Sequence, residues 1–454
     1  MSLLRLVPRF RAARRALPML AERTTWTRRQ IDAFQLDRIN ALWADASRHV
    51  PYYKAMRKRL GLPREFASLQ EYESRVPILR KPVVRASRDE LCRDAQLAGR
   101  WLLTSGSTGR PMRFFWSHRD YRLALQARYE FYASRGVDLF DRVTFLWGGR
   151  SRRETWWQRN VGGLRQNVTD RLRSRQRLSA FELDPETLRN QLRRIEHFKP
   201  VMLYGYSQAV HQLARQAVQS GFDCPSLKTV MMTSEVVTPA MRQVVRQGLK
   251  ADVAVEYGAM ECPLLAGEDT EGQLRVREDL VRLETVPTSS GRYEIVFTGL
   301  NNQDFPLLRY AIEDMTAAAL TVPARGVAVL PPVSGRSDDL LVTGDGRHVH
   351  ATAIDEVFEF ESAIRRYRVR QQGDGRVNAW IELDEPLRDG QLQGYKDKLS
   401  SIVTDRPVEV SVVDHVPLTD AGKNRPVSSV LSPNAPSLEQ PDRFTATQPA
   451  RELV

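Results

Sequence analysis

The spacing of apolar residues predicts a helical region near the start of the chain. From about residue 27 to residue 97, apolar side chains recur at intervals close to the helical period, as in Ile31, Phe34, Leu36, Ile39 and Leu42. Residues 1–26 differ, because they are basic and amphipathic and are interrupted by prolines. We therefore predict a basic N-terminal arm over residues 1–26, with a peripheral membrane contact as the alternative.

Farther along the chain, strand-like and helix-like segments alternate. A helix is predicted from Ser117 to Gly136, because Ser117 and Asp120 resemble a capping box and Gly136 provides a stop. Further helices are expected to begin at Asp184, Ser207 and Thr238. Buried strands are expected at 143–147, 201–204, 227–232 and 253–257. This alternation predicts a layered α/β domain.

The pattern changes from about Gln273 onward. Strand-like runs at 273–286, 292–300 and 305–310 predict a smaller β-rich subdomain. The roughly 90 residues beyond the segment 335–350 are expected to follow the order β-α-β-β-α-β, with Asp374–Gly375 as a hairpin turn. Residues 432–454 are poor in apolar residues, and we predict that they are disordered. The fold class is therefore a multidomain α/β protein with a compact α+β unit at its C-terminal end.

Composition narrows the functional classes. The net charge is +13 over 454 residues, but no nucleic-acid motif is present, so solvated basic surfaces are favoured over a nucleic-acid partner. A nucleic-acid or membrane-surface binder remains an alternative. The three cysteines show no metal-binding or disulfide spacing, which is typical of a reducing compartment. No apolar run approaches the roughly 18 residues that a membrane span needs, so we expect a cytoplasmic protein.

The segment 103–114, LTSGSTGRPMRF, has the composition of an anion-binding loop. Gly106 and Gly109 let backbone N–H groups turn toward a ligand, and neighbouring hydroxyls and Arg110 add donors and charge. The loop lies between the strand-like runs 101–104 and 112–116, so it is not the common P-loop, which leads from a strand into a helix. We interpret it as a polyphosphate-binding loop. A surface turn rich in Ser and Gly is the alternative.

TSGSTGRP resembles the phosphate loop of the adenylate-forming superfamily, and most closely that of the phenylacetate-CoA ligase-like branch, which includes proteins associated with capsular polysaccharide synthesis. The resemblance implies that Arg110 is catalytic and that the loop binds ATP through Thr104, Ser105, Gly106, Ser107, Thr108 and Gly109. It also implies a large adenylate-forming domain over 27–335, containing the β-rich subdomain, and a small mobile domain over 336–431.

Two further segments resemble superfamily motifs that follow predicted strands. In 255–261, VEYGAME, the resemblance places Tyr257 and Gly258 at the adenine and makes Glu261 a catalytic ligand of Mg²⁺. Met260 stands where the family usually has Ser or Thr. In 232–238, MTSEVVT, Ser234 and Glu235 are expected to line the adenine and acyl pocket. The alternative for 255–261 is a turn at the end of a strand with a surface glutamate, and the alternative for 232–238 is an ordinary helix start.

The remaining motifs lie nearer the C-terminus. In 306–314, PLLRYAIED, the resemblance implies that Asp314 accepts hydrogen bonds from the ribose, although Glu313 replaces the usual glycine. In 335–339, GRSDD, Arg336 would contact ribose or phosphate, and Asp338 matches the family's hinge. In 416–425, VPLTDAGKNR, Lys423 would reach the α-phosphate and the substrate carboxylate.

Together these motifs predict an AMP-forming acid ligase. It would use ATP and Mg²⁺ to convert a carboxylic acid into an acyl-adenylate and then transfer the acyl group to an acceptor such as coenzyme A. The segments 147–149 and 204–207 are the expected acyl-pocket walls, but neither the acid nor the acceptor follows from them. Met260 and Glu313 motivate the alternative of a catalytically degenerate, nucleotide-binding accessory protein of polysaccharide assembly.

Overall fold

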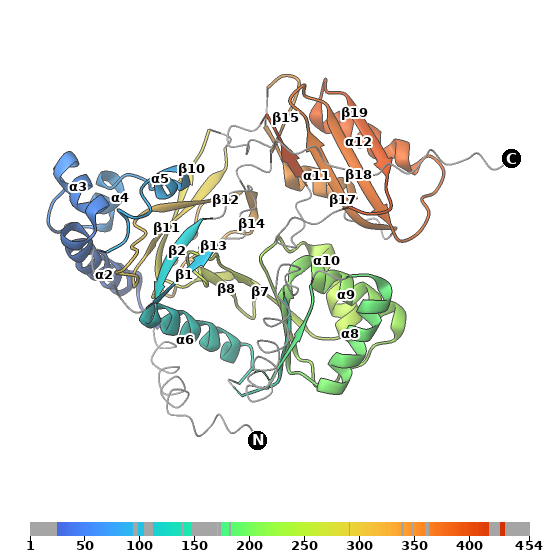
Figure 1. The fold of residues 1–454 in the computed structure, drawn as a ribbon, viewed down its shortest axis with the longest axis horizontal. Coiled ribbons are helices and arrows are strands. Elements are labelled where there is room, and N and C mark those ends of the chain that lie inside the picture. Colours follow the sequence, from blue (N-terminus) through green and yellow to red (C-terminus); the bar gives the residue numbers. More distant parts are fainter. Residues whose placement is uncertain are drawn as a thin grey trace, which may run out of the picture. The chain divides into compact units, whose positions relative to one another are not determined.

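The structure is a computed structural model, and it contains two compact units (Figure 1). One unit is made mainly of residues up to Val333, and the other mainly of residues from Ser334 onward. The residues that the structure describes are 25–93, 99–103, 112–138, 140–147, 170, 174–180, 183–289, 291–336, 340–346, 348–358, 363–416 and 427–431. None of the helices in these ranges is long and apolar enough to cross a membrane.

The largest sheet of the first unit has eight strands, in the order β13-β9-β8-β7-β6-β5-β3-β4. The strands from β7 to β4 are parallel to one another, and β8, β9 and β13 extend the sheet with antiparallel pairing. Their bounds are β3 Val143–Leu146, β4 Arg175–Leu178, β5 Met202–Tyr206, β6 Thr229–Thr233, β7 Asp252–Tyr257, β8 Ala266–Glu268, β9 Leu274–Val276 and β13 Val329–Leu330. The predicted alternating α/β layer is therefore confirmed.

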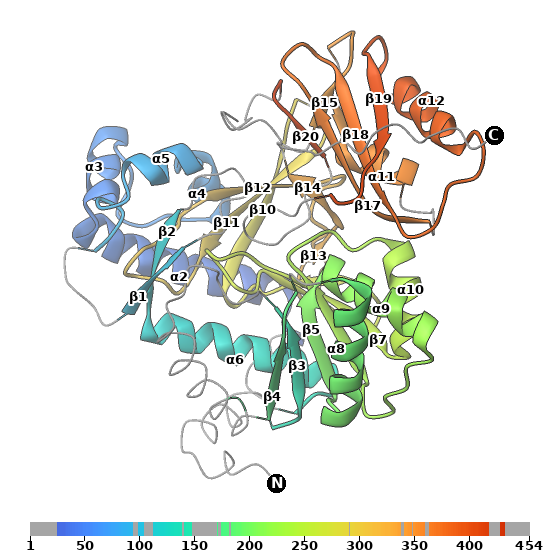
Figure 2. The ribbon, with the colours of Figure 1, turned by 45° about the vertical axis from the view of Figure 1, so that its right-hand side comes forward.

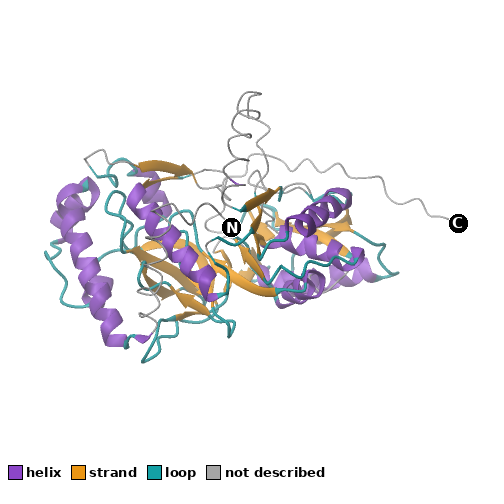
Figure 3. Ribbon diagram, turned by 90° about the horizontal axis from the view of Figure 1, so that it is seen from below, coloured by secondary structure: helices purple, strands orange, loops and turns teal. Residues whose placement is uncertain are grey.

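Helices cover both faces of this sheet (Figures 2 and 3). On one face lie α8 (Pro185–Phe198), α9 (Ser207–Ser220) and α10 (Pro239–Leu249), packed on residues such as Leu203 and Val230. On the other face lies α6 (His118–Ser134), whose Phe131 packs near Met231. The predicted caps are confirmed, because the side chains of Ser117, Asp184 and Thr238 each accept a hydrogen bond from a backbone N–H in the first turn of their helix.

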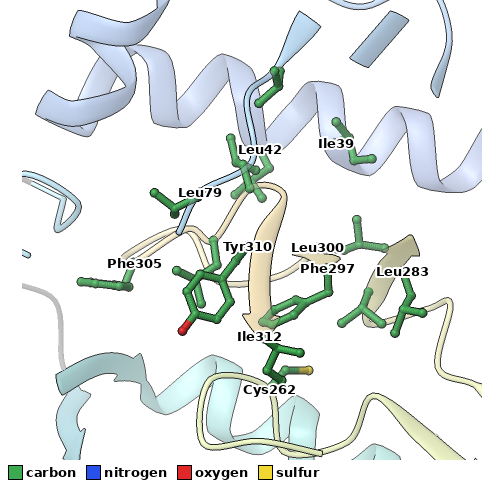
Figure 4. Packing of buried hydrophobic residues seen from close by; sticks show 14 of the residues in the cluster. Ile39, Leu42, Leu79, Cys262, Leu283, Phe297, Leu300, Phe305, Tyr310 and Ile312 are labelled. Atoms are coloured by element: carbon green, nitrogen blue, oxygen red, sulfur yellow. The ribbon is translucent and has the colours of Figure 1, made fainter. Parts of the chain in front are cut away.

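The N-terminal helices pack on a four-stranded sheet in the order β10-β11-β12-β14. The helices are α2 (Arg28–His49), α3 (Pro51–Leu60), α4 (Leu69–Arg75) and α5 (Lys81–Ala86). The strands are β10 Val281–Pro287, β11 Tyr293–Gly299, β12 Tyr310–Thr316 and β14 Val333–Arg336. Figure 4 shows the core between them, in which the rings of Tyr310 and Phe297 meet edge to face with centroids 5.6 Å apart. The hairpin β1 (Gly99–Leu103) and β2 (Arg113–Ser117) brackets the predicted phosphate loop.

The second unit has its own core. Its sheet β19-β18-β17-β20 is joined by helices α11 and α12, and β15 pairs only with β16 among the described strands. The elements are β15 Leu340–Val342, β16 His348–His350, α11 Ala351–Phe358, β17 Ile364–Gln371, β18 Val377–Leu383, α12 Gln391–Val403, β19 Val408–Val412 and β20 Val427–Ser429. The predicted hairpin turn is confirmed, because Gly375 has a φ of 88° and the N–H of Gln372 donates to the carbonyl of Arg376.

One element prediction is wrong. Residues 305–309 were expected to continue a strand, but they form a buried loop, and β12 begins only at Tyr310. Pro306 removes a backbone donor, and Arg309 adopts a positive φ of 47°, so this stretch does not extend the strand ladder. Arg309 is instead buried beside Glu284, with a side-chain distance of 2.7 Å between them.

Candidate active site

The ends of three parallel strands bring several predicted site residues together. In the sheet register, Tyr206 of β5 pairs with Thr233 of β6, and Thr233 pairs with Glu256 of β7. Each of these three strands ends at or one residue after this row of paired residues. Ser234, Glu235, Tyr257 and Gly258 therefore lie at the same edge of the sheet. The carboxyl ends of parallel strands are the usual position of a ligand-binding crevice in this class of fold.

The two predicted residues after β6 hold the neighbouring helix. Oε2 of Glu235 accepts a hydrogen bond of 2.9 Å from the backbone N–H of Gln208, in the first turn of α9. The hydroxyl of Ser207 donates to the carbonyls of Thr233 and Glu235, at 3.1 and 3.2 Å. Ser234 lies between them with a positive φ of 73°. Glu235 therefore caps a helix, a role that the sequence interpretation missed because the partner lies 27 residues away.

After β7, the chain forms a tight loop that returns to the sheet. The N–H of Leu265 donates to the carbonyl of Tyr257 at 2.9 Å, and the N–H of Ala259 donates to the carbonyl of Cys262 at 2.8 Å. A Cβ on Gly258 would lie 2.2 Å from the carbonyl oxygen of Pro263, so only glycine fits there. Burial raises the pKa of the Cys262 thiol, in the same loop, to about 12.

Glu261 is half-buried in this loop, and Oε1 of its carboxylate accepts a hydrogen bond of 3.0 Å from the hydroxyl of Tyr310. The described residues contain no group of three or more His, Cys, Asp or Glu side chains that could hold a metal ion. A single carboxylate suits Mg²⁺, because this ion binds through one or two carboxylates together with substrate phosphates and water. The donor set therefore fits an ion that arrives with a nucleotide.

A buried polar cluster is centred on Glu256, the residue before Tyr257. The carboxylate of Glu256, whose side chain is only 1% exposed, lies 2.6 Å from Nη2 of Arg128, and Oε1 also accepts a hydrogen bond of 3.0 Å from the hydroxyl of Tyr204. Burial, and then the charge of Glu256, raise the pKa of Tyr204, so its hydroxyl stays protonated and donates. The sequence interpretation missed this cluster. The one sequence feature that indicated the cluster was a glutamate inside the apolar strand 252–257, because a buried carboxylate requires a partner.

Aromatic side chains line the neighbouring strand ends. The ring of Trp147 lies 4.2 Å from that of Tyr206 and 5.5 Å from that of Tyr204, measured between centroids. Burial, followed by the charge of Glu235, raises the pKa of Tyr206 to about 12. The described parts of the two expected wall segments, Trp147 and residues 204–207, are therefore adjacent. Gly148 and Gly149 lie outside the described residues.

Strand β12 carries both Tyr310 and Asp314, the predicted ribose ligand. Asp314 is half-buried, and Glu313 before it has a φ of 69°, in the left-handed region that favours glycine. The backbone thus has a conformation for which glycine is the least strained residue, at the position where the superfamily commonly has glycine.

The other predicted site residues are not described by the structure. Arg336 is the last residue of β14, and its side chain is not described. Outside the described residues lie Thr104, Ser105, Gly106, Ser107, Thr108, Gly109, Arg110, Asp338 and Lys423. The same holds for the expected basic arm up to residue 24 and for the expected disordered tail, residues 432–454.

Comparisons with known proteins agree with these motifs. No family model matches the sequence. The chain is 22% identical to protein CapK of Staphylococcus aureus over 336 residues, which covers 71% of this chain and 72% of CapK. It is 23% identical to a phenylacetate-coenzyme A ligase of Thermus thermophilus, over 81% of this chain and 84% of the ligase. The match to the Pseudomonas putida phenylacetate-coenzyme A ligase, at 26% identity, covers 48% of that enzyme.

A solved structure has a similar fold over almost the whole chain. The model matches 2-hydroxyisobutyryl-CoA ligase in the postadenylation state with a TM-score of 0.71, 18% sequence identity, and coverage of 90% of this chain and 91% of that one. At this identity the likeness shows the fold alone, which is that of a ligase with a large N-terminal domain and a smaller C-terminal domain. The motifs, the relatives and the fold agree, and together they support an adenylate-forming superfamily related to phenylacetate-CoA ligase and CapK.

Proposed function

We propose that this protein is an AMP-forming acid ligase that activates a carboxylic acid with ATP and then transfers the acyl group to coenzyme A. The observation that carries the proposal is the position of Tyr310. Its hydroxyl donates to Glu261, the predicted metal ligand, and its ring packs edge to face against Phe114, with centroids 6.2 Å apart. Phe114 belongs to β2, which begins just after the predicted phosphate loop. The buried Tyr310 thus contacts Glu261, in one motif, and Phe114, which follows the predicted phosphate loop. Both motifs must act on the same nucleotide.

In the first step, the carboxylate of the acid replaces pyrophosphate on the α-phosphorus of ATP. A carboxylate oxygen of the acid forms a bond to the α-phosphorus of ATP, the bond from that phosphorus to the bridging oxygen breaks, and pyrophosphate leaves with that electron pair. In the second step, the thiolate sulfur of coenzyme A forms a bond to the acyl carbon, the bond from that carbon to the phosphate oxygen breaks, and AMP leaves with that electron pair. Two anions must meet in the first step, so cationic groups that neutralise the developing charge lower its barrier.

Each predicted residue has a proposed part in this chemistry. Tyr257 packs against the adenine, Asp314 accepts hydrogen bonds from the ribose, and the loop 104–109 with Arg110 holds the phosphates. Lys423 neutralises charge at the α-phosphate. Glu261 would hold Mg²⁺, which, when bound, would neutralise phosphate charge and orient the nucleotide. These roles rest on the superfamily motifs. For Glu261 the role also rests on the suitability of a single carboxylate, oriented by Tyr310, as a ligand of Mg²⁺.

The finer features are also proposals. Coenzyme A is proposed as the acceptor because relatives are coenzyme A ligases. We propose a link to capsular polysaccharide synthesis from the motif resemblance and the similarity to CapK. A cytoplasmic location, and a peripheral membrane contact of the basic arm as the alternative to a simple arm, rest on the sequence.

The direct test is ATP–pyrophosphate exchange with the purified protein across a panel of carboxylic acids, repeated with coenzyme A. We expect exchange that depends on one class of acid, and thioester plus AMP once coenzyme A is added. Exchange without thioester formation would contradict coenzyme A as the acceptor. No exchange with any acid, despite ATP binding, would contradict the enzyme assignment and favour a nucleotide-binding accessory protein.

A further inference from the structure

One arginine ties together the two ends of the loop that carries Glu261. Nη2 of Arg128, on α6, donates hydrogen bonds of 2.6 Å to Oε1 of Glu256 and 3.1 Å to the carbonyl of Pro263. Glu256 comes directly before Tyr257, and Pro263 comes two residues after Glu261. Arg128 therefore spans the base of a loop whose members include the predicted adenine contact and the predicted metal ligand.

The anchor at Glu256 is itself fixed by its neighbours. Besides Arg128, the hydroxyl of Tyr204 donates to its carboxylate, and the hydroxyl of Thr233 donates to its backbone carbonyl at 2.8 Å. The carboxylate is almost fully buried. Removing the arginine would leave an uncompensated buried charge, which is far more costly than losing an exposed ion pair. The arrangement thus links α6, β5 and β6 to the start of the loop.

We propose that Arg128 and Glu256 are positioning residues, which set the place of Tyr257 and Glu261 at the nucleotide without touching it. This inference rests on the proposed function. A displacement of about 1 Å at a group that binds the reactants can cost about a hundredfold in rate, so the loop must be held firmly. A guanidinium offers several donors in a fixed fork, whereas lysine has a single ammonium, so Arg128→Lys is expected to restore only part of the effect.

The chain offers a matched control on the same helix. Nη2 of Arg277 donates to Oε2 of Glu130 at 2.8 Å, and Nη1 donates to the carbonyl of Ala127 at 3.0 Å. Arg277 also pairs with Asp279, so its charge stays compensated when Glu130 is changed. Glu130→Gln therefore removes a half-buried ion pair of α6 while Arg128 keeps its hydrogen bonds to Glu256 and Pro263.

The loop also contains its own reporter. Cys262 is buried, with its thiol pKa raised by burial, and it belongs to the core cluster beside the four-stranded sheet. Cys224 is buried in a different cluster, beneath α8, α9 and α10. Alkylation of Cys262 without alkylation of Cys224 would therefore report local opening of the loop rather than unfolding of the whole unit.

The decisive measurement is the affinity for α,β-methylene-ATP, an analogue that cannot transfer its adenylyl group to an acid, by calorimetry with Mg²⁺ and with EDTA. In the wild type, Mg²⁺ should raise the affinity for the analogue, and Glu261→Gln should abolish this gain in affinity. Arg128→Ala should reduce the gain about fivefold to tenfold and speed alkylation of Cys262, and Glu130→Gln should do neither. In the Glu261→Gln background, Arg128→Ala should lower the affinity measured with Mg²⁺ by less than in the wild type, because its effect on Mg²⁺-dependent binding acts through Glu261.

Two results would overturn the inference alone. One is an unchanged gain from Mg²⁺ in Arg128→Ala, even if Cys262 becomes reactive, because Arg128 would then only stabilise the fold. The other is a loss of affinity with Mg²⁺ from Arg128→Ala that is as large in the Glu261→Gln background as in the wild type. A wild-type protein that binds no nucleotide would overturn the proposed function, and the inference with it. The three outcomes are therefore distinguishable.

Discussion

The hydroxyl of Tyr310 donates a hydrogen bond of 3.0 Å to the carboxylate of Glu261, although the two residues lie 49 positions apart, Tyr310 on β12 and Glu261 in the loop between β7 and β8. Tyr310 is fully buried among Phe114, Phe297 and their neighbours, so its hydroxyl has little freedom to move. The predicted metal ligand is therefore oriented by the rigid core of the β-rich part of the first unit.

This contact predicts a separable effect of Tyr310→Phe. The ring is retained, so the free energy of unfolding should fall by only about 1 kcal/mol, the usual net value of one hydrogen bond. The rate of ATP–pyrophosphate exchange should fall about tenfold, because Glu261 loses its orienting donor. Chemical denaturation and the exchange assay measure the two effects. A large loss of stability with unchanged exchange would show that the hydroxyl supports only the fold.

Glu235 should behave as a helix cap. Glu235→Ala removes the acceptor of the Gln208 N–H and should lower the free energy of unfolding by about 1 kcal/mol. Glu235→Gln keeps an acceptor oxygen and should recover most of that loss. Thermal unfolding of the three proteins tests this. Equal stability of the alanine and glutamine variants would contradict the capping role and leave only the predicted pocket role for this residue.

Glu313 has a strained backbone conformation, with a φ of 69°. A non-glycine residue in the left-handed region costs about 1 kcal/mol, and glycine avoids that strain. Glu313→Gly should therefore raise the midpoint of thermal unfolding, even though glycine loses more entropy on folding. Glu313→Ala serves as the control, because it removes the same side chain and keeps the strain. If both variants are equally destabilised, the contacts of the glutamate side chain outweigh the backbone strain.

His211, on α9, predicts a dependence of stability on pH. Burial, and then the nearby charge of Arg215, lower its pKa from 6.5 to about 4. Between these values the unfolded chain binds the proton more readily than the folded protein, so His211 favours unfolding increasingly as the pH falls from about 6.5 to about 4. The wild type should lose more stability over that window than His211→Gln. Denaturation curves at several pH values measure the difference, and parallel curves for the two proteins would refute it.

Local sequence signals predicted much of the fold. Asp184–Pro185 and Thr238–Pro239 predicted helix starts correctly, because a cap depends on residues within one turn. The loop at 305–309 was predicted wrongly, because its apolar residues are buried by tertiary packing rather than by a strand ladder. The length of an apolar run alone does not separate these two cases.

The candidate site was predicted only where a motif was contiguous. Tyr257, Gly258 and Glu261 lie in one short segment, and their resemblance to a superfamily motif was visible without the structure. The residues that hold this segment were not, because Arg128 lies 128 positions before Glu256 and Tyr310 lies 49 positions after Glu261. Pairings at such separations are set by the order of strands in the sheets, which a single sequence does not reveal.

The central claim is that this chain forms an acyl-adenylate with the help of a cation near its C-terminal end. It is tested most directly by ATP–pyrophosphate exchange with the best acid, comparing the wild type with Lys423→Ala and with Lys396→Ala, which removes an exposed lysine of α12 as the control. We predict that exchange is abolished in Lys423→Ala, unchanged in Lys396→Ala, and that circular dichroism is the same for all three proteins. Full exchange in a folded Lys423→Ala variant would contradict the claim.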